Sequence, residues 1–276
     1  MTDMNRDGLW RLIADLRFEL LQQRIAAEAD PRELCRVNTQ TFSQGPEDGV
    51  IAEIFRRIGW AGKAPGERTF IEIGVGDGRE NATRLLLSLG WSGVWVEGDA
   101  ENAAAIRRDF AAAIAAGRLR LVEAMATEAT IAELLRAAGA DERPDVLSID
   151  VDMHTYHIWR GLSGLRPRVA VIEYNASIPA PYEFVVPFDP QSVWDGSNWY
   201  GASLKSLELL GRERGMALVG SDAFGVNAFF VAEDEPLDAF VAPFTAERHH
   251  RPACYLAPMR WGHWPAKPRV TEAQTR

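Results

Sequence analysis

The sequence predicts an α/β protein built on a doubly wound, largely parallel sheet, and three observations carry this prediction. From Thr69 onward, short apolar runs rich in β-branched residues alternate with segments of helical periodicity. The first run, residues 70–75, leads into glycines at alternate positions, Gly74, Gly76 and Gly78. The second run, residues 93–97, ends in Glu97, 23 residues after Gly74. A glycine-rich turn followed by an acid roughly 20 residues later is typical of sheets that bind a ribose-containing ligand.

The elements of this sheet follow one another along the chain. Strands are predicted at 69–75, 93–97, 118–123, 145–151 and 168–174, followed by a hairpin of 216–221 and 226–232 around a turn at 222–225. Connecting helices are predicted at 79–89, 100–116, 127–138, 154–163 and 202–214. Residues 176–200, rich in proline and aromatic residues, form a long irregular insertion after the fifth strand. Loops of that length are usually functional or mobile.

Two helices are predicted before the sheet. Leu9, Ile13, Leu16 and Leu20 recur at helical spacing within residues 8–28, and this helix could cap the domain or pair with a partner subunit as a homodimer. A second helix begins after residues 43–49, where Pro46 suits a first helical position and the acids that follow favour the positive end of the helix dipole. We therefore divide the chain into an N-terminal helical region (1–66), a main domain (67–235) and a C-terminal extension (236–276).

Composition narrows the range of partners. The 276 residues carry a net charge of −9, which argues against a nucleic-acid backbone as the principal substrate. Two cysteines, Cys35 and Cys254, provide neither a disulfide framework nor a metal-binding spacing. No apolar segment approaches the ~18–20 residues of a membrane span, and residues 1–7 lack the apolar core of a signal peptide. We expect a cytoplasmic protein that acts on a small molecule.

Acidic residues gather after the fourth and fifth strands. Asp150 and Asp152 follow the fourth strand, and Glu173 and Asn175 follow the fifth. Because the carboxyl ends of neighbouring parallel strands share one edge, these side chains should converge. Oxygen ligands suit Mg²⁺ or another divalent cation, which would also relieve the repulsion among the carboxylates. In the alternative, Asp150 and Asp152 bind helix N-termini and orient a ligand without metal.

Histidines follow the same acids. His154 is the better candidate for a base, since imidazole titrates near neutral pH, whereas His157 reads as a helix residue packed beside Trp159. His249, His250 and His263 fall in a loop-rich region and are interpreted as surface residues.

The motif Glu72-x-Gly74-x-Gly76-x-Gly78 resembles the first motif of class I S-adenosylmethionine-dependent methyltransferases. Together with Gln44, Glu47 and Asp48 and the segments 95–99, 148–159, 171–175, 201–205 and 225–230, it is similar to the bacterial FkbM-type methyltransferase family over residues 40–232. The resemblance implies a Rossmann-like, seven-stranded class I methyltransferase sheet with N-terminal helices and an insertion after the fifth strand. It also implies O-methylation of a hydroxyl on a sugar, polyketide or other natural product.

The resemblance assigns roles residue by residue. The residues expected to bind S-adenosylmethionine are Gln44, Glu72, Gly74, Gly76, Gly78, Asn81, Glu97 and Asp150. Related macrocin-type enzymes imply a metal held by Asp150 and Glu173, with Asn175 where a second acid would stand, and Asp152 or His154 as base. Two other readings stay open. One is a metal-dependent glycosyltransferase that uses Asp150-x-Asp152, and the other is a methyltransferase-like binding protein without catalysis. The aromatic insertion could be a lid over the acceptor or a loop packed for structural reasons.

Overall fold

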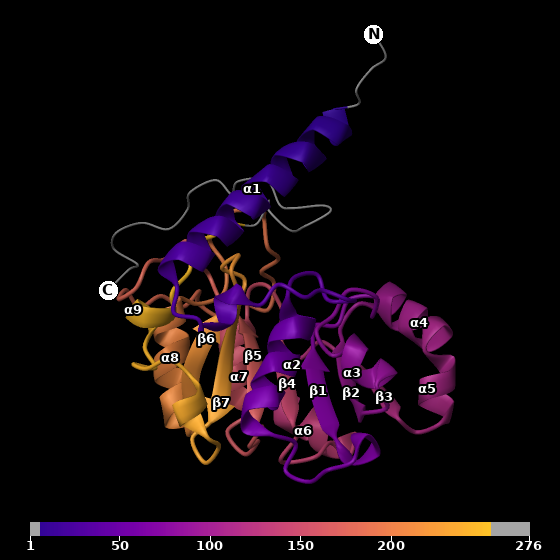
Figure 1. The fold of residues 1–276 in the computed structure, drawn as a ribbon. Coiled ribbons are helices and arrows are strands. Elements are labelled where there is room, and N and C mark those ends of the chain that lie inside the picture. Colours follow the sequence, from indigo (N-terminus) through magenta and orange to yellow (C-terminus); the bar gives the residue numbers. More distant parts are fainter. Residues whose placement is uncertain (1–5, 255–276) are drawn as a thin grey trace.

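The computed structural model describes residues 6–254, and its centre is a seven-stranded sheet (Figure 1). The strands are β1 (Thr69–Ile73), β2 (Ser92–Glu97), β3 (Leu119–Glu123), β4 (Val146–Ile149), β5 (Val169–Glu173), β6 (Met216–Ser221) and β7 (Asn227–Ala232). Their spatial order is β3-β2-β1-β4-β5-β7-β6, and β7 runs antiparallel to both of its neighbours. This confirms the predicted Rossmann-like sheet of the class I methyltransferase type, with each strand within two residues of its predicted bounds.

The helices match the prediction less closely. They are α1 (Arg6–Glu28), α2 (Glu47–Ile58), α3 (Arg84–Ser88), α4 (Ala100–Asp109), α5 (Ala111–Ala115), α6 (Ile131–Ala137), α7 (Thr155–Gly161), α8 (Leu204–Glu213) and α9 (Ala246–His249). Short 3-10 turns lie at Leu34–Arg36, Pro65–Glu67 and Leu237–Ala239. Pro46 precedes α2 rather than opening it, the helix predicted at 100–116 is interrupted at Phe110, and α9 was not predicted.

Apolar side chains on the two faces of the sheet form two separate cores, because successive strand residues point to opposite sides. Phe70 packs on one face with α2, α3 and α4, whereas Ile71 and Ile73 pack on the other with α6, α7 and α8. Helix α2 therefore covers the sheet as an integral layer. The described part of the chain contains no helix long and apolar enough to cross a membrane.

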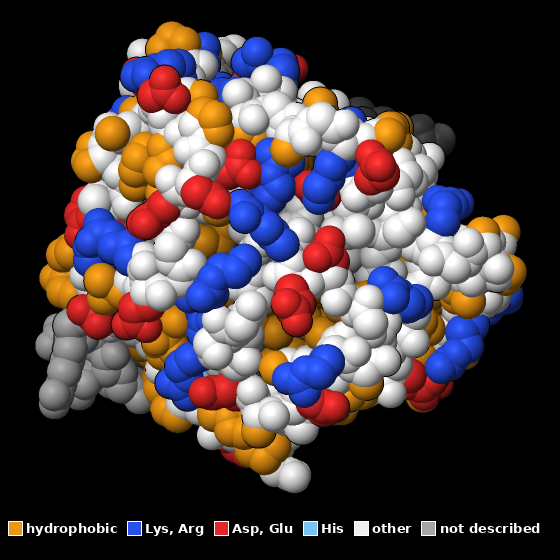
Figure 2. Space-filling view, turned by 90° about the horizontal axis from the view of Figure 1, so that it is seen from below, with side chains coloured by type: hydrophobic (Ala, Val, Ile, Leu, Met, Phe, Trp, Pro, Cys, Tyr) orange, Lys and Arg blue, Asp and Glu red, His pale blue; other side chains and the backbone are white. Residues whose placement is uncertain are grey.

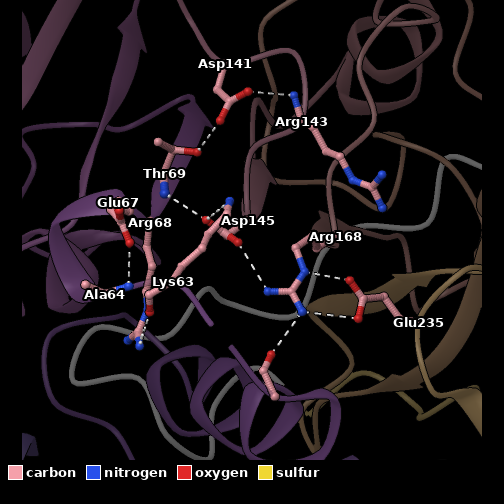
Figure 3. Close-up of polar contacts among 11 residues, drawn as sticks. Lys63, Ala64, Glu67, Arg68, Thr69, Asp141, Arg143, Asp145, Arg168 and Glu235 are labelled. Atoms are coloured by element: carbon pink, nitrogen blue, oxygen red, sulfur yellow. Dashed lines mark hydrogen bonds and ion pairs between the residues drawn. The ribbon is translucent and has the colours of Figure 1, made fainter. Parts of the chain in front are cut away.

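Ion pairs fasten the amino edge of the sheet (Figure 3). The buried Asp145 carboxylate accepts hydrogen bonds from Thr69 N at 2.9 Å, Lys63 Nζ at 3.0 Å and Arg168 Nη1 at 3.2 Å. Arg168 Nε donates in turn to Glu235 at 2.6 Å. On the face seen from below, basic and acidic side chains are interspersed (Figure 2). The hydrogen bonds of Asp145 and Arg168 join the segments before β1, β4 and β5 to the one after β7. They occupy the amino ends of these strands, which leaves the carboxyl ends for ligands.

The insertion between β5 and α8 forms a packed unit without a helix or strand. Phe184, Val186 and Tyr200 make a small apolar cluster with Met153, which follows β4. Trp199 packs edge-on against Phe184, with ring centroids 5.5 Å apart.

Candidate active site at the carboxyl edge

A cavity of about 650 Å³ opens at the carboxyl ends of β1, β2 and β4. Its wall includes Ser43 and Gln44 before α2, Glu47 at the start of α2, the end of β1 and the turn after it, the ends of β2 and β3, Ser148 of β4, residues 150–152 with His154 after β4, Val193 of the insertion, and Asn227 of β7. Seven of the eight residues predicted to bind the donor lie in this wall. Gly78 does not.

The three glycines of the motif have different structural roles. Gly74 has φ +81°, and a Cβ there would lie 1.7 Å from the Asp150 carbonyl oxygen, so β1 and β4 can approach only with glycine at this place. Gly76 has φ +60°, and a Cβ there would meet no protein atom within 4 Å. Gly78 lies under Phe110 and Trp95 and serves helix packing. The backbone at Gly76 is therefore the part of the motif that a ligand can approach closely.

Glu72 anchors the turn after β1 from inside. Its buried carboxylate accepts hydrogen bonds from Asn81 Nδ2 at 2.5 Å, Ala82 N at 2.9 Å, and Thr83 N and Oγ1 at 3.0 and 2.5 Å. These contacts bind residues 81–83 as a turn, which is why the helix predicted from residue 79 begins only at Arg84. Burial raises the pKa of Glu72, against the opposing effect of these donors.

Glu97 joins the glycine turn to the end of β2. Its Oε2 accepts from Gly76 N at 2.7 Å, and its Oε1 accepts from Asp99 N at 2.8 Å. A carboxylate oxygen has two lone pairs, so each oxygen can accept one further hydrogen bond. Asp99 is used differently, because its side chain caps α4 through Asn102 N at 2.8 Å.

A loop before α2 reaches the cavity from the other side. Asp48 Oδ2 accepts from the backbone N–H groups of residues 41, 42 and 43 at 2.9, 2.6 and 2.9 Å. The buried Glu47 carboxylate accepts from Gly45 N at 2.9 Å and Asn227 Nδ2 at 2.7 Å. This loop places Gln44 in the wall. The sequence indicated Glu47 only as a helix start and part of a family motif, and its place in the cavity was missed.

Asp150, Asp152 and Glu173 converge as the strand order predicts. One oxygen from each lies within 4.8 Å of the other two. Asp150 reaches the solvent of the open cavity, yet protein surrounds its carboxyl on most sides. Burial first, and then the charges of Asp152, Glu47 and Glu72, raise its pKa to about 7. Burial and the neighbouring acids also raise the pKa of Glu173. Oxygens at such separations fit a divalent cation, and they equally fit a shared proton.

Asn175 is not brought to the cavity wall. Its fully buried amide donates to the carbonyl oxygens of Asn198 and Tyr200 at 2.8 and 2.9 Å and accepts from Ser177 N at 3.1 Å. Asn175 therefore fastens the insertion to the end of β5, and its amide is used there rather than among the acids.

The histidines divide as follows. His154 lies in the cavity wall, its pKa is lowered by burial, and its Nε2 accepts a long 3.4 Å hydrogen bond from Asp189 N. His157 is buried and its Nε2 lies 2.8 Å from the Val186 carbonyl oxygen, so it ties the insertion to α7. The surface interpretation of His249 is wrong, because this side chain is 3% exposed in the C-terminal extension. His250 is half-buried, and His263 lies outside the described residues.

The cavity is acidic. Eight of its lining residues are carboxylates, and none of the described residues in the wall is Lys or Arg. The carboxylates are Glu47, Glu72, Asp77, Glu80, Glu97, Asp99, Asp150 and Asp152. A cavity of this charge favours a cationic ligand and disfavours phosphates.

No family model and no curated protein matches the sequence, so the FkbM-type membership is not confirmed. Among solved structures, this chain is similar to the O-methyltransferase from Bacillus cereus in complex with SAH. The identity is 16% over 78% of this chain and 89% of that chain, with a TM-score of 0.41. The CcbJ methyltransferase from Streptomyces caelestis is 16% identical over 68% and 96%, with a TM-score of 0.38. A cofactor-bound protein from MTB is 15% identical over 83% and 97%, with a TM-score of 0.43. Likenesses this distant assign no activity to this chain.

Proposed function

We propose that this chain transfers a methyl group from S-adenosylmethionine to a hydroxyl of a small acceptor, such as a sugar or polyketide. The observation that carries the proposal is the acid-lined cavity in which the Gly76 backbone and the Glu97 carboxylate lie together. S-adenosylmethionine has a sulfonium and an ammonium against one carboxylate, so it is a net cation. Glu97 has the capacity to accept hydrogen bonds from the ribose hydroxyls.

When bound, the donor supplies an electrophilic methyl group. In an in-line displacement, a bond forms between the acceptor oxygen and the methyl carbon as the carbon–sulfur bond breaks, and the hydroxyl proton passes to a base. Asp152 is accessible in the cavity, and its φ of +53° is a backbone conformation that non-glycine residues rarely adopt. His154 is neutral at pH 7 because burial lowers its pKa, but its accepting nitrogen faces Asp189 N. This geometry favours Asp152 as the base.

The acceptor would enter beside the insertion. Phe188 is 42% exposed and packs 4.8 Å from the His154 ring, and Val193 is 85% exposed in the cavity wall. Flat and apolar side chains at this mouth suit the carbon skeleton of a sugar or polyketide. The divalent cation belongs to the same proposal. Asp150 and Glu173 are the residues that would hold it beside Asp152, and bound there it would offset the mutual repulsion of the three acids.

Titration calorimetry with S-adenosylmethionine, NAD and UDP, each with and without Mg²⁺, tests the proposal. We expect S-adenosylmethionine to be the only one of the three ligands that binds. Binding of UDP only with metal would support the glycosyltransferase reading instead, although a pyrophosphate is disfavoured by eight nearby carboxylates. Binding of none of the three would leave a methyltransferase-like fold without this chemistry.

A further inference from the structure

Three acids at one end of the cavity have no basic partner. Glu47, Glu72 and Asp150 come from the start of α2, from β1 and from the end of β4, and the charges of the first two act on the third. Within residues 6–254, no salt bridge joins any of them to Lys or Arg. Glu47 and Glu72 are buried, and buried carboxylates are normally paired or compensated by a bound cation.

Asn81 offers a second and independent sign of a ligand. Its side chain is 6% exposed and lines the cavity, and its Oδ1 has no hydrogen-bond partner among the described residues. The amide orientation is settled by Glu72, because a flipped amide would set its oxygen against that carboxylate. A buried acceptor without a partner is costly, so a donor group from a ligand is expected at this place.

Both neighbouring glutamates already accept hydrogen bonds from the chain. Four donors occupy the Glu72 carboxylate, which has about four lone-pair sites. Glu47 accepts from Gly45 N and Asn227 Nδ2, and Ser43 and its own backbone contribute further hydrogen bonds. Neither carboxylate has a basic partner, so the attraction for a cationic group comes from its charge rather than from a free lone pair. Because Glu72 holds the turn of residues 81–83, Glu47 is the acid assigned to the ligand.

We propose that Glu47 and Asn81 bind the α-ammonium group of the methyl donor. This assignment rests on the proposed function. It gives the loop before α2 a direct role in donor recognition. Asn227 is a positioning residue that donates to Glu47, and Asp48 is one that holds the loop. An ammonium would donate to the partnerless Asn81 Oδ1 and would offset the uncompensated charge of Glu47.

Calorimetry with three probes tests the assignment. S-adenosylmethionine and S-adenosylhomocysteine both carry the ammonium, whereas 5′-methylthioadenosine carries the same nucleoside without it. We expect Glu47→Gln to weaken the first two at least tenfold and to change 5′-methylthioadenosine less than twofold. Glu101→Gln, the same substitution at an exposed position outside the cavity, is the matched control and should change none of them.

The outcomes separate the two proposals. If the unaltered protein binds none of the three probes, the proposed function fails. If it binds them but Glu47→Gln leaves S-adenosylmethionine unchanged, or weakens all three probes equally in a protein with an unaltered melting temperature, the ammonium assignment is overturned. Should Glu47→Gln unfold, the same three probes are measured on Asn81→Ser, which removes the partnerless oxygen and leaves the Glu47 contacts in place. Weaker binding of S-adenosylmethionine and S-adenosylhomocysteine, but not of 5′-methylthioadenosine, is then the expected result, and unchanged binding of all three overturns the assignment.

Discussion

Glu97 is the single residue on which donor affinity should depend most. If its carboxylate accepts the ribose hydroxyls, Glu97→Ala should weaken S-adenosylmethionine binding by about 1.5–3 kcal/mol, the range for hydrogen bonds to a charged group. Loss of its bonds to Gly76 N and Asp99 N acts in the same direction. Calorimetry on this variant and on Glu101→Ala, an exposed acid outside the cavity, measures the difference. Unchanged affinity in a folded variant would transfer the role to Asp99 or to no acid.

His249 should make stability depend on pH. Burial lowers its pKa to about 4, whereas an unfolded histidine titrates near 6.5. Because the unfolded state takes up the proton first, stability is present above pH 6.5 and is lost as the pH falls toward 4, by about 2 kcal/mol at pH 5.

The His249→Asn variant checks this effect. The His249 ring makes a hydrogen bond to the backbone of Val241. Asparagine keeps an N–H donor near the position of Nδ1 for this bond, but asparagine cannot be protonated. Thermal unfolding at pH 7.5 and pH 5.0 should show a smaller loss in the variant than in the unaltered protein. An equal loss in both would assign the pH dependence to other groups, such as His250, whose pKa burial also lowers.

At the scale of elements, the sequence predicts strands better than helix ends. Strands follow from apolar runs, and all seven were found because each run packs on the two cores, although β3 at the side of the sheet is only partly buried. Helix α3 was placed too early, because the hydrogen bonds of Glu72 to residues 81–83 leave no trace in helical periodicity. Asn175 was assigned to the acids from its strand end alone, and the direction of its side chain depends on an insertion whose path the sequence does not specify.

Helix α1 projects from the body (Figure 1). Phe18, Leu21 and Ile25 pack onto the body, while Leu12, Ile13, Leu16 and Leu20 are 37–64% exposed. Ile13, Leu16 and Leu20 have the spacing of alternate a and d positions in a heptad. In this register Glu19 occupies a g position and Arg24 the following e position, and both are exposed. In a parallel pair of helices, Glu19 of one copy would lie beside Arg24 of the other.

We therefore expect a homodimer through parallel α1 helices. Sedimentation at micromolar concentrations should give twice the 30.6 kDa of one chain. Leu16→Glu should give monomers, whereas Leu89→Glu, at an exposed leucine of the body, should not. Glu19→Arg alone should weaken the dimer, and adding Arg24→Glu should restore it. A monomeric unaltered protein, or a dimer that survives Leu16→Glu, contradicts this expectation.

At the scale of the whole molecule, the sheet gathers charge that is dispersed along the sequence. Acids from α2, β1, β2, β4 and β5 meet at the carboxyl edge, while ion pairs fasten the amino edge. The convergence of Asp150, Asp152 and Glu173 could be predicted, since strand order alone brings it about. The contribution of Glu47 could not, because it depends on how a loop before the sheet folds back onto β7.

This concentration of charge leads to the last prediction, which concerns a divalent cation. The pKa of Asp150 is raised to about 7 in the folded protein, against about 3.8 for the ordinary group. Its favourable contribution is therefore complete below pH 3.8 and is lost as the pH rises through 7, where the ionised acids repel one another. A cation bound among Asp150, Asp152 and Glu173 would reverse that loss.

Mg²⁺ or Mn²⁺ should raise the melting temperature at pH 8 and have little effect at pH 5.5, and a chelator should abolish the increase. Asp150→Asn and Glu173→Gln should each remove the response, whereas Glu101→Gln should keep it. If the melting temperature at pH 8 is the same with metal and with chelator, the three acids share a proton instead. Asp152 would then act without a metal beside it.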